Sequence, residues 1–501
     1  MRIMNPTEKT IHLPANYVVA SVSVVEPNNI TSLLKPKTDA STPDSHIEHD
    51  NILDFDLSDS DLSEEQKTLL LLFLHKNRKV FAKDLSELGV TNLYKHTIDT
   101  GDALPIRKRF YRQSPPVLEE MNKQIDKMLQ NDIIEESESE WAAPLAMCKK
   151  KSGELRFCCD FRALNKVTRP KFFPLPRMED VLDSLGRSQA QIFSTLDLLS
   201  GYWQCQLDPA TAHKSAFVTP SGVYQWKRLP FGLAAAPSSF QHLLTQVLHH
   251  LNYQIALVYV DDILVFSKTF EDHLKHLQLV FDRLRAANLT LKPSKCLFAR
   301  KEVIYLGHKV SKQGVEVDRS KIETVESFPV PKNEKQVRSF LGLCNYYRKF
   351  VKGYGHIAGP LHNLTKESVP FEWTEACQKA FDKLKQALIS SPVLAYPDMS
   401  RDFILTTDAS GTAIGYVLSQ LDDEGRERVI AYNGRSLTEA ERKWSATEHE
   451  CLAILEGIKT YHVYLAYKHY KVYTDHRALK FLKNIKQSSA RWSVLLQGYD
   501  M

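Results

Sequence analysis

Two adjacent aspartates, Asp261 and Asp262, interrupt an apolar segment that runs from Ile255 to Phe266. The β-branched and aromatic residues on both sides of the pair favour β-strands. A carboxylate in apolar surroundings is costly unless it is paired or binds a metal ion, and two neighbouring carboxylates also repel each other. We therefore expect a β-hairpin with the aspartates at its tip and a divalent cation beside them. An ordinary solvated Asp-Asp turn is the alternative that this segment alone leaves open.

A third aspartate, Asp197, ends a similar apolar segment, and a Ser200-Gly201 turn follows it. Three carboxylates on neighbouring strands can hold two Mg²⁺ ions, which stabilise the attacking and leaving oxygens of a phosphoryl transfer. Mg²⁺ prefers oxygen ligands and retains waters and substrate phosphates, so three protein ligands suffice. The pattern predicts a two-metal site formed by Asp197, Asp261 and Asp262, in which Mn²⁺ can substitute for Mg²⁺.

Five segments resemble the motifs of reverse transcriptases and occur in that family's order. They are Arg156–Lys166 (fingers), Phe193–Tyr202 (first palm motif), Leu229–Gln241 (between the aspartate motifs), Tyr259–Asp262 (signature) and Tyr305–His308 (primer grip). The chain most resembles the Pol polyprotein of gypsy-type (Metaviridae) LTR retrotransposons, over roughly residues 60–501. The resemblance implies an α+β, right-hand polymerase fold of fingers, palm and thumb. It also implies an RNA-directed DNA polymerase that extends a primer 3′-hydroxyl with dNTPs on an RNA or DNA template.

The same resemblance implies roles for three further residues. Arg156 would contact the triphosphate, for which a guanidinium fork is suited. Lys150, favoured over its neighbours Lys149 and Lys151, would reach the γ-phosphate. Tyr202 would lie under the sugar and exclude a 2′-hydroxyl, thereby selecting deoxynucleotides. The alternatives are an exposed basic turn for the two cations and simple packing in the palm for Tyr202.

A second set of acids lies near the C-terminus. Asp408 ends an apolar strand, Glu450 lies on a helix, and Asp475 ends a later strand. Acids from such elements can converge on two metal ions. These segments resemble the ribonuclease H domain of the same retroelements, an α/β fold, which favours Glu450 and leaves Glu448 as the second choice. Three unrelated surface acids are the alternative.

Ribonuclease H domains of this type use a fourth acid on a helix beyond the last strand. The sequence ends at Met501, 26 residues after Asp475, and Asp500 comes too early with the wrong flanking residues. From this we expect a fragment of a polyprotein whose ribonuclease H-like domain lacks its C-terminal end. Cleavage of the RNA strand of a hybrid would then be very weak or absent. A catalytically silent, nucleic-acid-binding remnant of a truncated element is the alternative function.

A chain of 501 residues is long enough for about three domains. Residues 39–65 contain ten acidic residues and no Lys or Arg, which predicts a flexible acidic linker. We expect a protease-trailing segment and linker (1–63), fingers and palm (64–315), a helical thumb and connection (316–395), and the ribonuclease H-like domain (396–501). The net charge of +5 does not identify a nucleic-acid binder, although basic residues cluster at 107–109 and 149–151.

The eight cysteines form no CxxC pair, which disfavours a zinc site or a disulfide scaffold and fits a reducing compartment. No apolar run approaches 18 residues, and the N-terminus lacks the apolar segment of a signal peptide. We expect no membrane association and an intracellular location, either cytoplasmic, including virus-like particles, or nuclear. The resemblance implies RNA and DNA template–primer and dNTPs as partners. It leaves the oligomeric state open.

Overall fold

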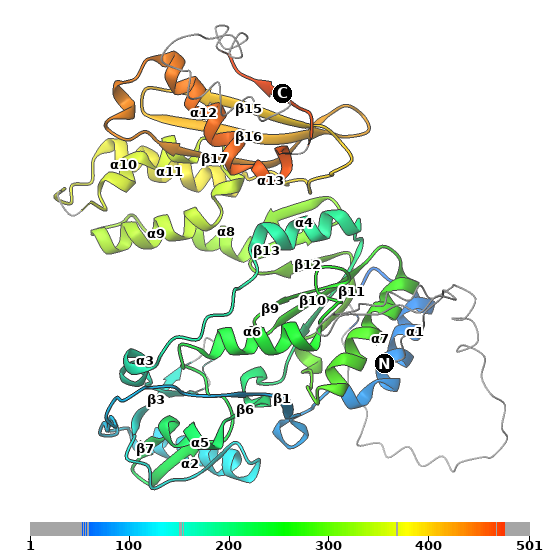
Figure 1. Ribbon diagram of the computed structural model, residues 1–501, viewed down its shortest axis with the longest axis vertical. Helices are drawn as coiled ribbons and strands as arrows, with labels where there is room; N and C mark the ends of the chain where they lie inside the picture. The colour runs from blue at the N-terminus through cyan, green and yellow to red at the C-terminus, as the bar shows by residue number, and fades with distance from the viewer. Residues whose placement is uncertain are drawn as a thin grey trace, which may run out of the picture. The chain divides into compact units, whose positions relative to one another are not determined.

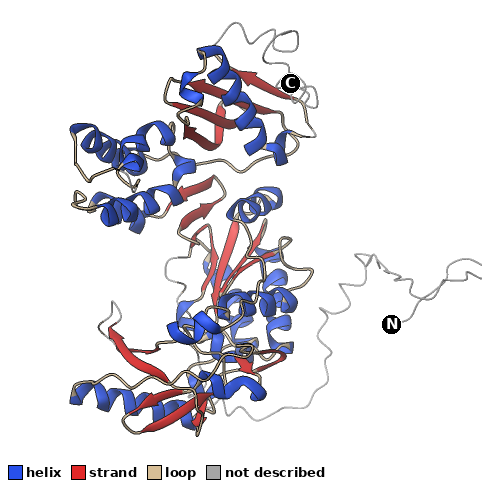
Figure 2. Cartoon of the chain, turned by 60° about the vertical axis from the view of Figure 1, so that its left-hand side comes forward, coloured by secondary structure: helices blue, strands red, loops and turns tan. Residues whose placement is uncertain are grey.

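The structure is a computed structural model that describes residues 53, 55, 57, 60–149, 153, 155–366, 369–466 and 468–475 (Figure 1). Several expectations fall outside these residues: the segment before residue 53, Lys150 and Asp500. Helices and strands alternate in groups along the described chain (Figure 2), which confirms the predicted α+β class. None of the described helices combines the length and the apolar character needed to cross a bilayer.

The expected fingers contain a five-stranded sheet in the order β2-β8-β7-β3-β4. Its strands are β2 (Ile134–Glu136), β3 (Ala143–Lys149), β4 (Leu155–Cys159), β7 (Phe217–Thr219) and β8 (Gly222–Trp226). A separate parallel pair joins β1 (Thr91–His96) to β6 (Cys205–Leu207). The helices of this part are α1 (Glu64–Lys76), α2 (Pro115–Gln130), α3 (Arg162–Val167) and α5 (Pro209–Ala212). Helix α2 buries Met121, Ile125 and Met128 at helical spacing, and Asn131 is its C-cap.

Helix α1 is shorter than the apolar pattern that begins in it. It ends at Lys76, and a single 3₁₀ turn, Arg78–Val80, follows. Asn77 stops the helix because its side-chain amide donates to the Phe73 carbonyl at 3.0 Å and to Gln278 at 3.1 Å. The apolar pattern extends past the helix because the segment after it, including Phe81, is also buried.

The expected palm contains a four-stranded antiparallel sheet in the order β11-β5-β10-β9. Its strands are β5 (Ile192–Asp197), β9 (Ala256–Tyr259), β10 (Asp262–Ser267) and β11 (Leu297–Arg300). Helices α6 (Ala236–Val247) and α7 (Phe270–Ala286) contribute to the apolar core that contains Ile263 and Val265 of β10. Helix α4 (Met178–Ser188) contributes to the core that contains Leu264 and Phe266. Alternate residues of β10 thus enter different cores, which explains why its apolar run is continuous.

A three-stranded antiparallel sheet follows, formed by β12 (Glu302–Tyr305), β13 (His308–Ser311) and β14 (Gly314–Val317). The domain boundary expected at 315/316 therefore falls inside β14. Four helices come next: α8 (Arg319–Glu326), α9 (Glu334–Tyr346), α10 (Tyr354–Asn363) and α11 (Glu375–Ile389). The core of this part buries an apolar stripe made of Phe340, Leu341, Cys344, Tyr347 and Phe350.

The last described part is a four-stranded sheet in the order β17-β16-β15-β18. Its strands are β15 (Phe403–Ala409), β16 (Ala413–Leu421), β17 (Glu427–Ser436) and β18 (Tyr470–Tyr473). Two helices, α12 (Ala446–Thr460) and α13 (His462–Leu465), lie between β17 and β18 in the chain. The break occurs at Tyr461, whose hydroxyl donates to the Ala431 carbonyl at 3.1 Å and anchors the chain on β17.

Candidate active sites

Three aspartates lie at one edge of the palm sheet. Asp197 is the last residue of β5, Asp262 is the first residue of β10, and the antiparallel register places these two residues directly opposite each other. Asp261 occupies the turn that joins β9 to β10. The predicted hairpin tip is confirmed, and the structure brings together the three acids that the sequence singled out.

The turn before the paired aspartates has an unfavourable backbone. Val260 has a φ of 55°, a region that β-branched residues rarely adopt. Its N–H donates to the side-chain oxygen of Gln241 at 2.6 Å, and the Gln241 amide donates to the Val258 carbonyl at 3.2 Å. Gln241 is 1% exposed on α6. Helix α6 therefore holds the turn that presents Asp261 and Asp262.

The aspartates perturb one another. Partial burial of its carboxyl group, followed by the charges of Asp261 and Asp197, raises the pKa of Asp262 to about 6, although the residue as a whole is exposed. Burial also raises the pKa of Asp197, against the opposing charge of Lys295. The ammonium group of Lys295 lies 3.2 and 3.1 Å from the two Asp197 carboxylate oxygens. The cluster is thus an acidic group with one cation already beside it.

The donor set fits a hard divalent cation, because all three side chains offer carboxylate oxygens and repel one another without a counter-charge. Among the described residues, however, no three or more His, Cys, Asp or Glu side chains are arranged so that together they could hold a metal ion. In this structure the Asp197 carboxylate is paired with the ammonium group of Lys295 at 3.1 Å.

Aromatic side chains connect Tyr202 to the fingers. The Tyr202 ring contacts Phe231 and Phe240, with centroids 5.0 and 5.2 Å apart. Burial, followed by the charge of Asp261, raises the pKa of Tyr202 to about 12, so its hydroxyl lies within the field of the acidic cluster. The guanidinium of Arg156 lies over the other partner, Phe231, at 5.2 Å from the ring centroid. Phe231 therefore links two of the three residues that the resemblance assigned to the nucleotide, Arg156 and Tyr202.

The basic turn of the fingers is only partly described. Strands β3 and β4 pair antiparallel with Lys149 opposite Leu155, which confirms two strands on either side of the basic segment. Lys149 and Arg156 are exposed near the end of this ribbon. Lys150, the residue favoured for the γ-phosphate, lies outside the described residues.

The second set of acids also converges. Strands β15 and β18 are parallel neighbours, with Thr406 opposite Tyr473, so Asp408 and Asp475 follow at the same edge. Glu450, 5% exposed on α12, accepts hydrogen bonds from the Ala409 N–H at 3.0 Å and from the Thr474 hydroxyl at 3.4 Å. Burial, then the charges of Asp475 and Asp408, raises the pKa of Glu450.

Glu448, the other candidate on α12, caps the N-terminus of this helix. Ser445 is the N-cap of the helix, and the Glu448 carboxylate accepts from the Ser445 N–H at 2.8 Å to complete a capping box. Glu448 therefore stabilises the start of α12. Glu450, two residues later, points toward Asp408 and Asp475 instead.

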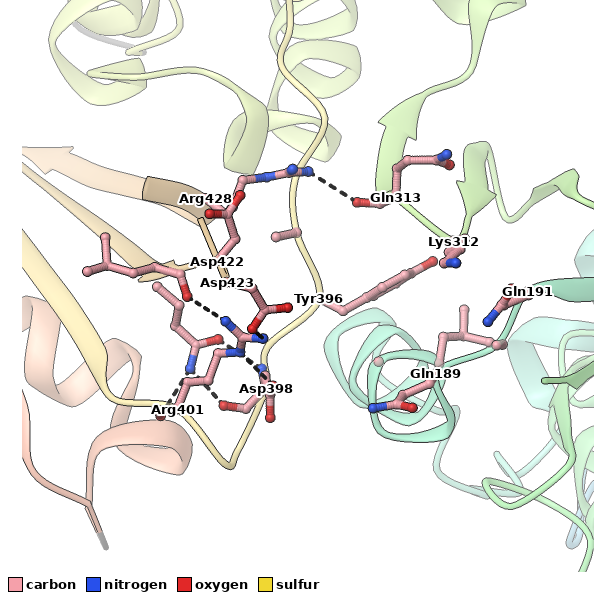
Figure 3. A pocket seen from close by; sticks show the side chains of 16 residues that line it. Gln189, Gln191, Lys312, Gln313, Tyr396, Asp398, Arg401, Asp422, Asp423 and Arg428 are labelled. Atoms are coloured by element: carbon pink, nitrogen blue, oxygen red, sulfur yellow. Dashed lines mark hydrogen bonds and ion pairs between the residues drawn. The ribbon is translucent and has the colours of Figure 1, made fainter. Parts of the chain in front are cut away.

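Neither set of acids lines the hollow that Figure 3 shows. This hollow, of about 680 Å³, lies among α4, the β13–β14 turn and the start of the last sheet. Its charged side chains are largely satisfied: Arg401 pairs with Asp398 at 2.9 Å and with Asp423 at 2.7 Å, and Arg428 donates to the Gln313 carbonyl at 3.5 Å. Nothing in this lining resembles a catalytic arrangement.

Comparisons with known proteins now bear on these two sites. Residues 148–310 match the family model described as reverse transcriptase (RNA-dependent DNA polymerase), and residues 373–472 match the RNase H-like domain found in reverse transcriptase. The chain is 39% identical over 418 residues, 82% of its length, to the retrovirus-related Pol polyprotein from transposon 412 of Drosophila melanogaster. The chain belongs to the retrovirus-related Pol polyproteins of transposons. This confirms the resemblance to LTR retrotransposon Pol.

Another Pol relative is the transposon Tf2-3 polyprotein of Schizosaccharomyces pombe, 35% identical over 79% of the chain. The chain covers 34% of the transposon 412 polyprotein and 30% of the Tf2-3 polyprotein, about a third of each. Among solved structures, the Pol chain resembles the foamy viral protease-reverse transcriptase in complex with dsDNA, with a TM-score of 0.75 and 24% identity. The match covers 88% of this chain and 92% of that one. This likeness confirms the predicted polymerase fold.

Two residues of the polymerase site were not predicted from the sequence. Gln241 lies inside a segment that resembles the family, but an uncharged amide gave no sign of its contact with the Val260 turn. Lys295 ends a single 3₁₀ turn, Pro293–Lys295, far from Asp197 in sequence, and only the fold brings the two side chains together. A basic residue just before β11, the strand that pairs with β5, is the signal that could have located it.

Proposed function

We propose that this Pol chain is an RNA-directed DNA polymerase that extends a primer 3′-hydroxyl with dNTPs. The observation that carries the proposal is the pairing of Asp197 with Asp262 across β5 and β10, with Asp261 in the adjoining turn. The reverse transcriptase domain match over 148–310 supports it. RNA and DNA template–primers are the proposed partners, since foamy viral relatives with this fold were solved in complex with dsDNA and with RNA/DNA hybrid.

In the proposed reaction, the primer 3′-hydroxyl attacks the α-phosphate of the incoming nucleotide and pyrophosphate leaves. Asp197 and Asp261, with Asp262 beside them, would hold the divalent cations. Two bound Mg²⁺ ions supply charge stabilisation at the attacking and leaving oxygens. The carboxylates position the reacting oxygens, and Lys295 neutralises Asp197 in the arrangement described here.

The nucleotide is held by residues outside the acidic cluster. Arg156 offers a guanidinium fork to phosphate oxygens, and this group lies over the Phe231 ring. Tyr202, supported by Phe231 and Phe240, supplies a rigid ring for the proposed contact under the sugar. We retain Lys150 as the proposed partner of the γ-phosphate.

A second activity, cleavage of the RNA strand of an RNA–DNA hybrid, is proposed for Asp408, Glu450 and Asp475. The convergence of an acid at the end of β15, one on α12 and one after β18 supports it. These carboxylates would hold divalent cations in the same way. A buried, hydrogen-bonded Glu450 would provide the fixed ligand of the three.

Primer extension on poly(rA)/oligo(dT) with Mg²⁺ tests the main proposal. We expect DNA synthesis by the 501-residue chain, and its loss by orders of magnitude in Asp197→Asn and in Asp261→Asn, while template–primer binding survives. Binding without any synthesis by the unaltered chain would instead favour a catalytically silent nucleic-acid-binding remnant. Near-normal extension by either variant would refute the assignment of the acids.

A further inference from the structure

Two cysteines lie on one face of the fingers ribbon formed by β3 and β4. The antiparallel register places Ala146 opposite Cys158 and Cys148 opposite Arg156. Residues 146 and 148 project from the same face of β3, so Cys148 and Cys158 are diagonal neighbours across the ribbon. Burial raises the pKa of the Cys158 thiol, and the charge of Cys148 and a hydrogen bond with its side chain raise it further. The two sulfur atoms are therefore close to each other.

These two thiols are also the most accessible ones in the chain. All eight cysteines lie in the part of the chain that the structure describes, and all are free thiols. Cys148 is exposed, Cys158 is partly buried, and the others are buried. Because thiol chemistry depends on access, a small molecule in solution reaches Cys148 before any other thiol.

The end of the ribbon that carries Cys148 can change its twist. Strand β4 is at the edge of the five-stranded sheet, and within the described residues β3 pairs with β7 only at Ala143 and Pro144. Beyond Pro144, β3 and β4 form a two-stranded ribbon, and such ribbons twist more than wider sheets. A diagonal pair needs this freedom, because a disulfide requires Cβ atoms about 4 Å apart.

Arg156 lies beside both cysteines on this face. It is the direct cross-strand partner of Cys148 and is two residues from Cys158 on β4. Its guanidinium lies 5.2 Å from the centroid of the Phe231 ring. A bond between the two cysteines therefore forms next to the side chain that is proposed to bind the triphosphate.

We propose that Cys148 and Cys158 form a reversible disulfide, with a low-molecular-weight disulfide such as oxidised glutathione as the oxidant, and that this bridge weakens nucleotide binding by Arg156. The effect on the nucleotide rests on the proposed polymerase function, whereas formation of the bridge does not. Closing the diagonal changes the twist of the ribbon, and this moves Arg156 relative to Phe231.

The reaction has two exchange steps. The Cys148 thiolate attacks one sulfur of oxidised glutathione, the glutathione S–S bond breaks, and one glutathione thiolate leaves. The Cys158 thiolate then attacks the Cys148 sulfur of the mixed disulfide, and the second glutathione leaves. The two cysteines lose two electrons and two protons, which convert oxidised glutathione to two molecules of glutathione. Excess thiol reverses both steps, as is typical of exposed regulatory disulfides in reducing compartments.

The experiment treats the 501-residue chain with oxidised glutathione and identifies the products by mass spectrometry of non-reduced peptides. We expect a Cys148–Cys158 disulfide that excess dithiothreitol removes. In single-turnover extension on poly(rA)/oligo(dT), the oxidised chain should need about tenfold more dTTP for the half-maximal rate, the effect of one lost hydrogen bond to a charged group. Dithiothreitol should restore the original dTTP dependence.

Cys148→Ser is the matched variant, because Cys148 is exposed and serine has a similar size. This variant should show the dTTP dependence of the reduced chain and should not respond to oxidised glutathione. Cys158→Ser should stop at the first exchange step, with one glutathione retained on Cys148.

A stable mixed disulfide on Cys148 of the unaltered chain, without a bridge to Cys158, would overturn the proposal. A bridge that leaves the dTTP dependence unchanged would overturn the link to Arg156. An equal response of Cys148→Ser to the oxidant would place the effect at another site and overturn it as well. If the reduced chain makes no DNA, the polymerase proposal fails, while the mass measurement still decides whether the bridge forms.

Discussion

Substituting Gln241 should reveal how much of the polymerase rate depends on the Val260 turn. Gln241→Met keeps the length and flexibility of the side chain but removes the acceptor of the Val260 N–H, 2.6 Å away, and the donor to the Val258 carbonyl. Helix α6 is otherwise unchanged, because methionine favours helices as well as glutamine does. The proposed metal ligands Asp197, Asp261 and Asp262 are untouched.

The magnitude follows from the backbone of the turn. A β-branched residue at positive φ costs about 1–3 kcal/mol, and the structure around it must supply that energy. Two lost hydrogen bonds of about 1 kcal/mol each remove most of this support. The turn is then free to relax toward negative φ, which moves Asp261 and Asp262. A displacement of about 1 Å in a reacting group costs about 10²-fold in rate.

We therefore expect Gln241→Met to lower the single-turnover extension rate by about 10²-fold, with template–primer affinity unchanged. The matched control is Gln246→Met, an exposed glutamine on the same helix, which should behave as the unaltered chain. Combining Gln241→Met with Val260→Gly should recover part of the rate, because glycine adopts positive φ without strain. An unaltered rate in Gln241→Met, or a loss equal to that of Gln246→Met, would refute the reasoning.

Three further predictions follow from the other sites. Tyr202→Val should raise ribonucleotide incorporation by about one to two orders of magnitude, with a modest loss of dNTP incorporation. Unchanged sugar discrimination in competition assays would show that the Tyr202 ring only packs in the palm. Glu450→Gln should abolish whatever hybrid cleavage the chain performs while Glu448→Gln retains it, as measured on a labelled RNA–DNA duplex; the reverse order would contradict the assignment. Burial raises the pKa of Asp183 to about 6, from 3.8 in the unfolded chain, although the Tyr464 hydroxyl donates to its carboxylate at 2.8 and 2.9 Å. The ionised carboxylate therefore destabilises the fold, and stability falls as the pH rises from about 3.8 to about 6. Asp183→Asn should therefore raise Tm at pH 7.5, because it removes a destabilisation of at most about 3 kcal/mol. The Tm should be unchanged near pH 3.5. A similar Tm shift at both pH values would exclude this explanation.

The polymerase acids could be predicted because each interrupts or ends an apolar strand, a pattern with few structural explanations. Strand limits in the last domain were also predictable, since β15, β16 and β17 alternate with clear turns. The pairing of Asp197 with Asp262 was not, because register depends on contacts between segments 65 residues apart. The choice of Glu450 over Glu448 rested on the resemblance, and the capping box now gives it a physical basis.

The supporting contacts share one physical feature that the sequence hides. Ser200, Val260 and Leu306, three of the non-glycine residues with positive φ, all lie in turns close to the polymerase acids. Each of these turns is held by a side chain from another position: the Gln204 amide donates to the Leu199 carbonyl at 2.8 Å, Gln241 accepts from Val260, and Tyr346 donates to Leu306.

Strained backbone persists only where its surroundings over-determine it, and it concentrates at functional sites. A turn built from glycine would adopt a positive φ without support, but it would also change to other conformations easily. A strained turn held by hydrogen bonds has one favourable geometry, and that geometry is lost when the holding side chain is removed. Substitutions of Gln241 and Tyr346 should therefore lower the polymerase rate more than their lack of charge suggests. Replacing the strained residue by glycine should recover rate only in a variant that has already lost the side chain holding the turn.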